Sequence, residues 1–229
     1  MAVEIERFGG PPFPGEDVPP WAQRPLHYRL CKRVLDLAIA IPLLAVTAVP
    51  QLLIALLVRL DSPGPALFRQ ERLGLDAQPF SFFKFRSMHV DAAQRFADFY
   101  DYGAIAAQGG HVPLKYRDDP RLTRFGRWLR RSSLDELPNL LHVVRGEMSL
   151  VGPRPELPAL LPCYAPEHLL NFRVKPGLTG LPQTSGRDGL TVAETVALDL
   201  HYAKNANLAL DLRILFRTVA CVLTGRDAF

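Results

Sequence analysis

From Leu37 to Val58 the chain carries no charged side chain. As one straight α-helix, at about 1.5 Å per residue, this run would reach roughly 33 Å, which is enough to cross the hydrocarbon core of a bilayer. Buried helices of soluble proteins seldom stay uncharged over such a length. The run therefore predicts a segment that lies in a membrane, and the rest of the chain must be arranged around it.

Prolines and basic flanks decide how this segment can meet the membrane. Pro42 and Pro50 interrupt the run, and each proline removes a helical hydrogen bond and favours a kink. Lys32, Arg33 and Arg59 flank its two ends, so the positive-inside rule gives it no direction. Two arrangements fit these features: a kinked transmembrane helix, which is the simpler interpretation, and a hairpin that enters and leaves on the cytoplasmic side.

The length and composition of the chain bound the rest. With 229 residues, of which 48% are hydrophobic, it can form one packed domain but not two ordinary domains with a linker. The beginning of the chain is rich in proline and glycine and lacks the basic start and apolar run of a signal peptide. We therefore expect a disordered tail over 1–25, the membrane segment over 26–60 and one folded domain over 61–229.

Charge and motifs narrow the classes of function. The formal net charge of +4 favours anionic partners such as phosphates, acidic lipids or nucleic acids. Three cysteines without paired spacing argue against a disulfide framework and against a zinc site, so a reducing cytoplasm is expected. The sequence contains no H-E-x-x-H, Walker loop, G-x-G-x-x-G or G-x-S-x-G motif, which argues against zinc hydrolases, P-loop kinases and serine esterases.

Local patterns predict several elements after the membrane segment. Two Phe-rich segments, 66–71 and 79–88, are joined by a Gly-containing connection and predict a β-hairpin. Residues 90–102 predict a helix and 103–116 a loop. The six arginines within 117–131 recur every three or four residues beside an apolar stripe, which predicts a basic amphipathic helix that either binds acidic lipid or covers an ordinary core. Another amphipathic pattern begins at Asn205, for which packing on the domain is the simpler interpretation.

The carboxylates that follow the arginines are the main candidates for chemistry. Ser133, followed three residues later by Glu136, fits a capping box that places Asp135 in the first turn of a helix. On these residues alone, Glu136 caps the helix and Asp135 complements its dipole. The neighbouring arginines favour another interpretation, because Arg side chains hold phosphate oxygens and a carboxylate among them can be a nucleophile or a metal ligand.

Two later clusters could contact a ligand. Arg154 lies between two prolines, whose rings restrict the backbone and pre-orient the guanidinium for bidentate contact with phosphate. An arginine in a rigid surface loop is equally consistent with this segment. Residues 175–187, which include Gln183 and Arg187, form a Gly- and Pro-containing stretch whose backbone could approach a ligand, although such a stretch is more often only a loop.

Four segments together carry a resemblance to a known family. They are Phe-Arg-Gln-Glu-Arg at 68–72, Phe-Lys-Phe-Arg-Ser-Met at 83–88, Ser-Leu-Asp-Glu-Leu-Pro at 133–138 and Met-Ser-Leu-Val-Gly-Pro-Arg-Pro at 148–155. In this order they resemble the monotopic bacterial phosphoglycosyl transferases, which start capsule, exopolysaccharide and glycan synthesis on a polyprenyl phosphate. The resemblance covers nearly everything from Lys32 to Gly225, and four segments in register are specific where any one would be weak.

The resemblance implies a reaction and the residues that perform it. The family's catalytic Asp-Glu dyad falls on Asp135 and Glu136. By this similarity Asp135 attacks the β-phosphate of a UDP-sugar, UMP leaves, and the phosphosugar stays on the enzyme until polyprenyl phosphate, usually undecaprenyl phosphate, accepts it. Glu136 would help to bind Mg²⁺, a hard ion that bridges phosphate oxygens with few protein ligands. Lys84, Arg86 and Arg154 would neutralise the phosphates.

The resemblance also implies a fold and a location. The expected fold is mainly α with a small β-hairpin, a re-entrant membrane helix-break-helix and amphipathic interfacial helices, which reverses the preference for a spanning helix. The family's break is often Ser-Pro, whereas here the residue before Pro50 is Val49, so freed carbonyls need another partner such as Thr47 or the Gln51 amide. The enzyme would work at the cytoplasmic face of the inner membrane, where UDP-sugar and lipid phosphate meet. Asp199 matches an acidic position of the family and is a candidate substrate residue.

Other classes of function make different predictions. A membrane-anchored scaffold that binds acidic lipid would keep its function after Asp135→Asn, because lipid attraction needs only the cations. A nucleic-acid-binding protein would show salt-dependent binding, yet no familiar module of that kind is visible, so we expect no nucleic-acid partner. The stretch 90–116 favours relatives that use glucose or galactose. The sequence identifies neither the sugar nor the oligomeric state.

Overall fold

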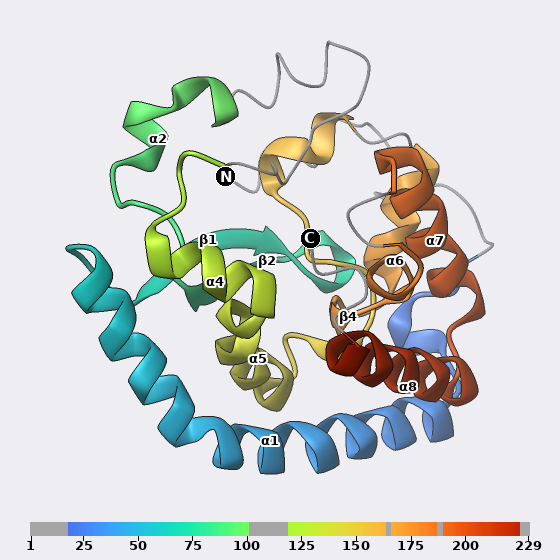
Figure 1. Cartoon of the computed structure of the whole chain (residues 1–229). Coiled ribbons are helices and arrows are strands. Elements are labelled where there is room, and N and C mark those ends of the chain that lie inside the picture. The colour runs from blue at the N-terminus through green and yellow to red at the C-terminus, as the bar shows by residue number, and fades with distance from the viewer. Residues whose placement is uncertain (1–17, 101–118, 164–165, 187–189, 225–229) are drawn as a thin grey trace.

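The computed structural model describes residues 18–100, 119–163, 166–186 and 190–224. These residues form a mainly helical domain with two small two-stranded sheets, cradled by one long helix (Figure 1). The elements are η2 (Trp21–Gln23), α1 (Leu26–Asp61), β1 (Leu67–Leu73), η3 (Leu75–Ala77), β2 (Pro79–Phe85), α2 (Ala92–Arg95), η4 (Ala97–Tyr100), α4 (Arg124–Ser132), η5 (Leu134–Asn139), α5 (Leu140–Arg145), β3 (Ser149–Val151), η6 (Pro158–Cys163), η7 (Pro166–Arg173), β4 (Gly177–Thr179), α6 (Leu181–Thr184), α7 (Val192–Asn205) and α8 (Leu208–Thr224).

The apolar run lies in α1, which is a single helix of 36 residues that continues through Pro42 and Pro50. Figure 1 shows α1 running beneath the domain and then turning upward toward β1. Near Pro50, Thr47 Oγ1 donates to the Leu43 carbonyl at 2.6 Å and accepts from Gln51 Nε2 at 3.0 Å. Thr47 and Gln51 are therefore the polar side chains at this part of the helix, as expected. The carbonyl that Thr47 satisfies is that of Leu43, and Gln51 bonds Thr47. The helix has no interruption at Pro50, and the re-entrant arrangement stays a prediction.

Both halves of α1 pack against the same domain. In the first half, Lys32, Asp36 and Ala40 are buried against elements that include α5, β3 and α8. In the second half, Ile54 and Val58 share a buried cluster with Phe85 of β2 and Leu129 of α4. A helix held in this way at both ends cannot pass straight out of the domain.

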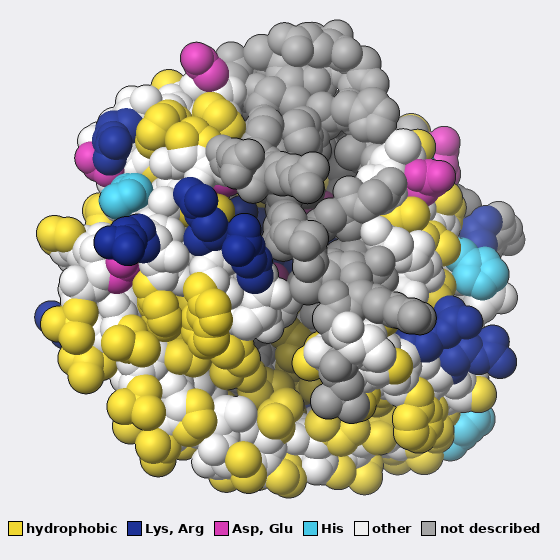
Figure 2. Space-filling view, viewed as in Figure 1, with side chains coloured by type: hydrophobic (Ala, Val, Ile, Leu, Met, Phe, Trp, Pro, Cys, Tyr) yellow, Lys and Arg dark blue, Asp and Glu magenta, His cyan; other side chains and the backbone are white. Residues whose placement is uncertain are grey.

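The outward face of α1 is apolar and continues onto α8. Only 11% of the most apolar window of α1 is buried, and within the described residues α1 is the helix long and apolar enough to cross a membrane. Figure 2 shows hydrophobic side chains gathered over the lower part of the molecule, where α1 and α8 lie. The most exposed of them are Val34, Val46, Val49, Leu52, Leu60, Phe216 and Val222. A surface of this kind marks contact with a membrane or a partner, which agrees with the sequence. The domain packing expected for the last helix is confirmed by buried Ile214, but the opposite face of α8 remains exposed.

The predicted β-hairpin is confirmed. Strands β1 and β2 pair antiparallel from Leu67 opposite Phe85 to Leu73 opposite Pro79, and η3 forms their connection. A second sheet pairs β3 and β4 in parallel, which brings the segment before Arg154 beside Gly177. A Cβ atom on Gly152 would lie 2.3 Å from the Lys175 carbonyl oxygen, so this close approach requires glycine.

Several predicted boundaries need correction. Residues 18–25 are ordered rather than disordered, because Val18 enters the main core and Arg24 donates to the carbonyls of α7 and its C-terminal end. The basic helix begins only at Arg124, where Thr123 caps it through the Gly126 amide at 3.0 Å. In place of the helix expected over 90–102, the described residues up to Tyr100 form the short elements α2 and η4. The loop expected over 103–116 lies outside the described residues.

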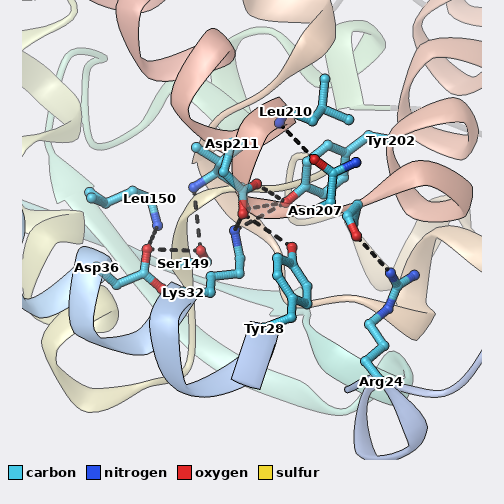
Figure 3. Close-up of polar contacts among 12 residues, drawn as sticks. Arg24, Tyr28, Lys32, Asp36, Ser149, Leu150, Tyr202, Asn207, Leu210 and Asp211 are labelled. Atoms are coloured by element: carbon cyan, nitrogen blue, oxygen red, sulfur yellow. Dashed lines mark hydrogen bonds and ion pairs between the residues drawn. The ribbon is translucent and has the colours of Figure 1, made fainter. Parts of the chain in front are cut away.

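A buried polar network fixes the first half of α1 to the domain (Figure 3). Lys32 Nζ lies 3.0 Å from Asp211 Oδ2 and also donates to the Val151 carbonyl at 3.0 Å. The Asp211 carboxylate accepts further hydrogen bonds from the hydroxyls of Tyr202 at 2.7 Å and Tyr28 at 3.1 Å. Because Val151 ends β3, this network holds the strand that leads to Arg154.

Neighbouring residues of α1 add contacts to the same elements. Asp36 Oδ1 accepts from the Leu150 amide at 2.9 Å and from Ser149 Oγ at 3.0 Å, so it holds β3 as well. Arg33 donates to the last carbonyls of α5, those of Val143 and Val144, at 2.6 and 2.7 Å. The basic and acidic residues at the start of α1 thus position both segments that carry the candidate active site.

Candidate active site

Asp135 and Glu136 lie in the first turn of η5, directly after the basic helix α4. The predicted capping box is wrong: Ser133 has a left-handed conformation, with φ of 57°, and its side chain makes no capping hydrogen bond. Ser133 instead ends α4, and the chain reverses there into a 3₁₀ turn. This turn buries Asp135, which is 5% exposed, while Glu136 stays partly accessible.

Burial and the neighbouring cations have opposing effects on the pKa of the Asp135 carboxyl. Burial is the largest effect and raises the pKa of the Asp135 carboxyl, and the Glu136 carboxylate raises it further. Lys84 opposes this rise most strongly, followed by Arg130 and Arg154. Three cations thus act on two adjacent carboxylates, of which Asp135 is buried and Glu136 is partly exposed.

Arg154 joins the loop after β3 to the dyad. Its Nη2 lies 2.9 Å from Glu136 Oε1 in an ion pair whose side chains are partly exposed. The Glu136 carboxylate is the main cause of the raised pKa of Arg154, and Glu156 and Asp135 add to it. The interpretation of Arg154 as a pre-oriented cation near the dyad is therefore supported by its geometry.

Lys84 reaches the same site from strand β2. Burial, and then the positive charges of Arg130 and Arg154, lower the pKa of Lys84 to about 8, although Asp135 and Glu136 act in the opposite direction. The hairpin therefore contributes one cation whose charge is sensitive to pH near neutrality. Lys84 therefore acts on both carboxylates, and its predicted role in neutralising substrate phosphate stays a prediction.

Arg86 does not join this group. Its Nη1 and Nη2 donate to Ser62 Oγ and Ser62 O at 2.5 and 2.8 Å, and its Nε donates to the Pro65 carbonyl at 2.7 Å. All three nitrogens therefore satisfy the end of α1 and the turn after it. The expectation that Arg86 neutralises substrate phosphate is replaced by a structural role, because its donors are already used.

Arg130 is a site residue that the sequence did not single out. It is partly buried in α4, Asp135 is the main neighbour that raises its pKa, and burial nevertheless lowers that pKa overall. Its Nη1 also lies 3.7 Å from Asp119 Oδ2, and Asp119 is fully buried and paired with Arg121 at 2.7 Å. The signal was present in the arginine spacing, but the spacing could not tell which arginine faces Asp135.

The remaining candidates lie around this centre. Asp199 of α7 is buried in a pocket that Arg154 also lines. Gln183 lies in α6 and its Oε1 is buried without a hydrogen-bond partner in the part of the chain that the structure describes. Arg187 lies outside the described residues.

This arrangement suits reactions at a phosphate. A buried carboxylate next to cations can attack phosphorus while the cations hold the phosphate oxygens. The two adjacent carboxylates also fit Mg²⁺, which commonly takes one or two carboxylates and completes its shell with water and substrate phosphate. No group of three or more His, Cys, Asp or Glu side chains suited to a metal occurs among the described residues, so any metal here would depend on oxygens from elsewhere.

Comparison with known proteins identifies the family. A family model described as bacterial sugar transferase matches residues 27–225. The chain belongs to this family. The match contains all of α1 but its first residue, the hairpin and both segments of the candidate active site. It confirms the family and the class of enzyme, a phosphoglycosyl transferase, inferred from the four segments.

Individual relatives of this bacterial sugar transferase support the membership. The chain is 43% identical over 208 residues to UDP-glucose:undecaprenyl-phosphate glucose-1-phosphate transferase of Caulobacter vibrioides, which covers 87% of this chain and 72% of the relative. It is 41% identical over 238 residues to undecaprenyl-phosphate glucose phosphotransferase of Komagataeibacter xylinus, covering 98% and 41%. It is 39% identical over 201 residues to UDP-galactose-lipid carrier transferase of Erwinia amylovora, covering 88% and 42%. The chain thus spans about two fifths of the length of these last two relatives.

Proposed function

We propose that this chain transfers a hexose 1-phosphate from a UDP-sugar to undecaprenyl phosphate, releasing UMP, as the first membrane step of exopolysaccharide synthesis. The observation that carries the proposal is the buried Asp135 carboxylate surrounded by Lys84, Arg130 and Arg154. The names of the relatives support glucose or galactose as the sugar and undecaprenyl phosphate as the acceptor.

The proposed reaction has two displacements at one phosphorus. An Asp135 oxygen forms a bond to the β-phosphorus of the donor, the bond to the bridging oxygen breaks, and that oxygen leaves with its electron pair as part of UMP. An oxygen of undecaprenyl phosphate then attacks the same phosphorus and the aspartyl-phosphate bond breaks, which restores the carboxylate. Such an intermediate lets two substrates use one site in turn and gives ping-pong kinetics.

The neighbouring side chains divide the remaining tasks. Lys84, Arg130 and Arg154 hold the phosphate oxygens and stabilise the negative charge that develops on them. Glu136 keeps Arg154 beside the dyad through their ion pair and is the carboxylate best placed to hold Mg²⁺. The bound ion supplies additional positive charge at the phosphate oxygens.

The location follows from the two substrates. In our proposal α1 lies in one leaflet of the inner membrane as a re-entrant helix, with the domain on the cytoplasmic face. The contacts of both halves of α1 with one domain support this arrangement, as does the exposed apolar face shared by α1 and α8. A soluble nucleotide donor and a membrane-bound acceptor could then reach Asp135 from opposite sides.

A labelling experiment tests the covalent step. Purified full-length protein is incubated with Mg²⁺ and with UDP-glucose or UDP-galactose radiolabelled in the β-phosphate, without lipid. We expect label on the denatured wild-type protein and release of UMP, and we expect undecaprenyl phosphate to move the label into lipid. Asp135→Asn should retain no label and should lower turnover by at least about 1,000-fold.

The same variant has an expected effect on stability. Because burial raises the pKa of Asp135, its charged form is disfavoured in the folded protein, so the neutral Asn side chain should raise the unfolding temperature by a few degrees. Asp91→Asn, which neutralises an exposed carboxylate, is the matched control and should change neither labelling nor stability. A folded wild-type protein that neither takes up label nor releases UMP would favour the lipid-binding scaffold.

A further inference from the structure

A pocket next to the candidate active site contains polar atoms that the proposed reaction does not use. It is formed where the end of β1, the loop after β3, η7 and α7 meet. We call it the Asp199 pocket; the lining residues that matter here are Gly74, Arg154, Glu156, Asn171 and Asp199. Arg154 lines it, whereas neither carboxylate of the dyad does.

Two of the residues that line the pocket each have a buried oxygen without a hydrogen-bond donor among the described residues. Asp199 Oδ1 and Asn171 Oδ1 are buried and unpartnered within the described part of the chain, and their residues are 5% and 8% exposed. Burying an acceptor without a donor costs free energy, so such atoms mark places where a donor is expected to bind. Asp199 lies in α7 and Asn171 in η7, so it is the tertiary fold that brings the two residues to one pocket.

The charges around the pocket limit the chemistry of its ligand. Burial and the Glu156 carboxylate raise the pKa of Asp199, which shows that a further negative charge is disfavoured here. Arg154 acts in the opposite direction, but it is already paired with Glu136 and would itself repel a metal ion. A neutral ligand with several O–H donors fits best, because it satisfies acceptors without adding charge.

The position of Arg154 relates this ligand to the reaction. One end of its guanidinium contacts Glu136 of the dyad, and the residue also lines the Asp199 pocket. A phosphate held by Arg154 would therefore lie next to the pocket. Of the two groups on the donor's β-phosphate, the hexose offers more hydroxyl donors than the nucleoside, which has two ribose hydroxyls and one uracil N–H.

We propose that the Asp199 pocket binds the sugar ring of the donor, with Asp199 Oδ1 and Asn171 Oδ1 accepting hydrogen bonds from its hydroxyl groups. The inference rests on the proposed function and adds to it the residues that recognise the sugar. Asp199 and Asn171 then act on the choice of donor and leave the nucleotide untouched.

Binding and kinetics of substituted protein test this assignment. Asp199→Leu and Asn171→Leu, which remove the accepting oxygens, are compared with wild type for kcat/KM with UDP-glucose and UDP-galactose, and for inhibition by UMP. We expect kcat/KM to fall about 10- to 100-fold for the preferred UDP-hexose, while the inhibition constant of UMP changes less than about twofold. Asp91→Asn is again the exposed carboxylate control, and thermal unfolding shows that each variant is folded.

Deoxy donors identify the contact itself. A UDP-deoxyhexose that lacks the contacted hydroxyl should be a poorer substrate of wild type, and substitution of the accepting residue should cause little further loss. Wild-type kcat/KM in both folded variants would overturn the proposal, as would a parallel weakening of UMP, because the pocket would then hold the nucleotide.

A binding measurement tests the pocket assignment independently of the covalent reaction. Calorimetry on Asp135→Asn protein compares the affinity of a UDP-hexose with that of UDP, so it needs no turnover. If the sugar adds affinity and Asp199→Leu removes that increment, the pocket assignment holds even where the covalent step fails. If the increment is unaffected by both substitutions, the assignment is wrong whatever the reaction.

Discussion

Lys84 and Arg86 stand two residues apart at the end of one strand, yet their side chains have different partners. Lys84 lies within the electrostatic reach of Asp135, whereas Arg86 binds the carbonyls at the end of α1. The sequence predicts that this segment carries cations, but it cannot show that the strand ends at Phe85 and that the next side chain turns toward another element. The candidate site was thus predicted at Asp135, Glu136 and Arg154 by short motifs, while Arg130 required the fold.

The pH dependence of the reaction should report Lys84. Its pKa is lowered to about 8, and it must be protonated to neutralise a phosphate, so kcat/KM should fall as pH rises through about 8. The direction follows because deprotonation removes the positive charge above that pH. Replacing the lysine by arginine, which stays charged, should move this alkaline limb upward by more than about one pH unit, even if the maximum rate falls.

The control for this profile is an exposed lysine that is not among the groups acting on Asp135. Lys204 is exposed at the end of α7, so Lys204→Arg should leave the alkaline limb where it is. An unchanged limb in Lys84→Arg would assign the titration to another group and would contradict the role given to Lys84.

Elements with strong local signals were predictable, and elements defined by packing were not. The hairpin follows from its Phe-rich strands and Gly-containing connection, and α1 follows from its uncharged run. The start of α4 depends instead on contact with another segment: a Cβ on Gly126 would lie 2.0 Å from the Ser87 carbonyl oxygen, so α4 packs on that segment through this glycine. No periodicity in the arginines reports such a contact, which is why the helix begins later than predicted.

The fixation of α1 to the domain depends on the Lys32 network. Lys32→Met would leave the fully buried Asp211 carboxylate without its cation, and removing one partner of a buried pair commonly costs about 3 to 5 kcal/mol. We expect a matching loss of stability in thermal unfolding of detergent-solubilised protein. The double variant Lys32→Met with Asp211→Asn should recover a substantial part of this loss, because it removes the unpaired charge.

A matched substitution separates the buried pair from a general loss of charge. Lys204→Met removes a lysine that is exposed and should change stability by less than about 0.5 kcal/mol. Equal stability of wild type and Lys32→Met would show that the network does not hold α1 to β3.

The molecule as a whole combines an apolar underside with a site that needs two different substrates. α1 and α8 expose large hydrophobic side chains side by side, and the contacts at both halves of α1 keep its ends with the same domain. Hydropathy predicts the membrane segment but counts only length and charge, so it cannot distinguish a spanning helix from one that bends around its own domain. The tertiary contacts favour the second arrangement.

Cysteine accessibility decides between these topologies. In a background with the native cysteines replaced by serine, His27→Cys places an exposed thiol in the first turn of α1 and Glu71→Cys places one after the helix. If α1 is re-entrant, a membrane-impermeant maleimide should label both in inside-out vesicles and neither in intact spheroplasts, while detergent permits labelling of both in either preparation. Labelling of the two positions from opposite faces would require α1 to cross the bilayer. Because Ile54 and Val58 pack on the domain that also holds Lys32, crossing would break one set of these contacts, so a spanning protein should also be much less stable than the folded enzyme.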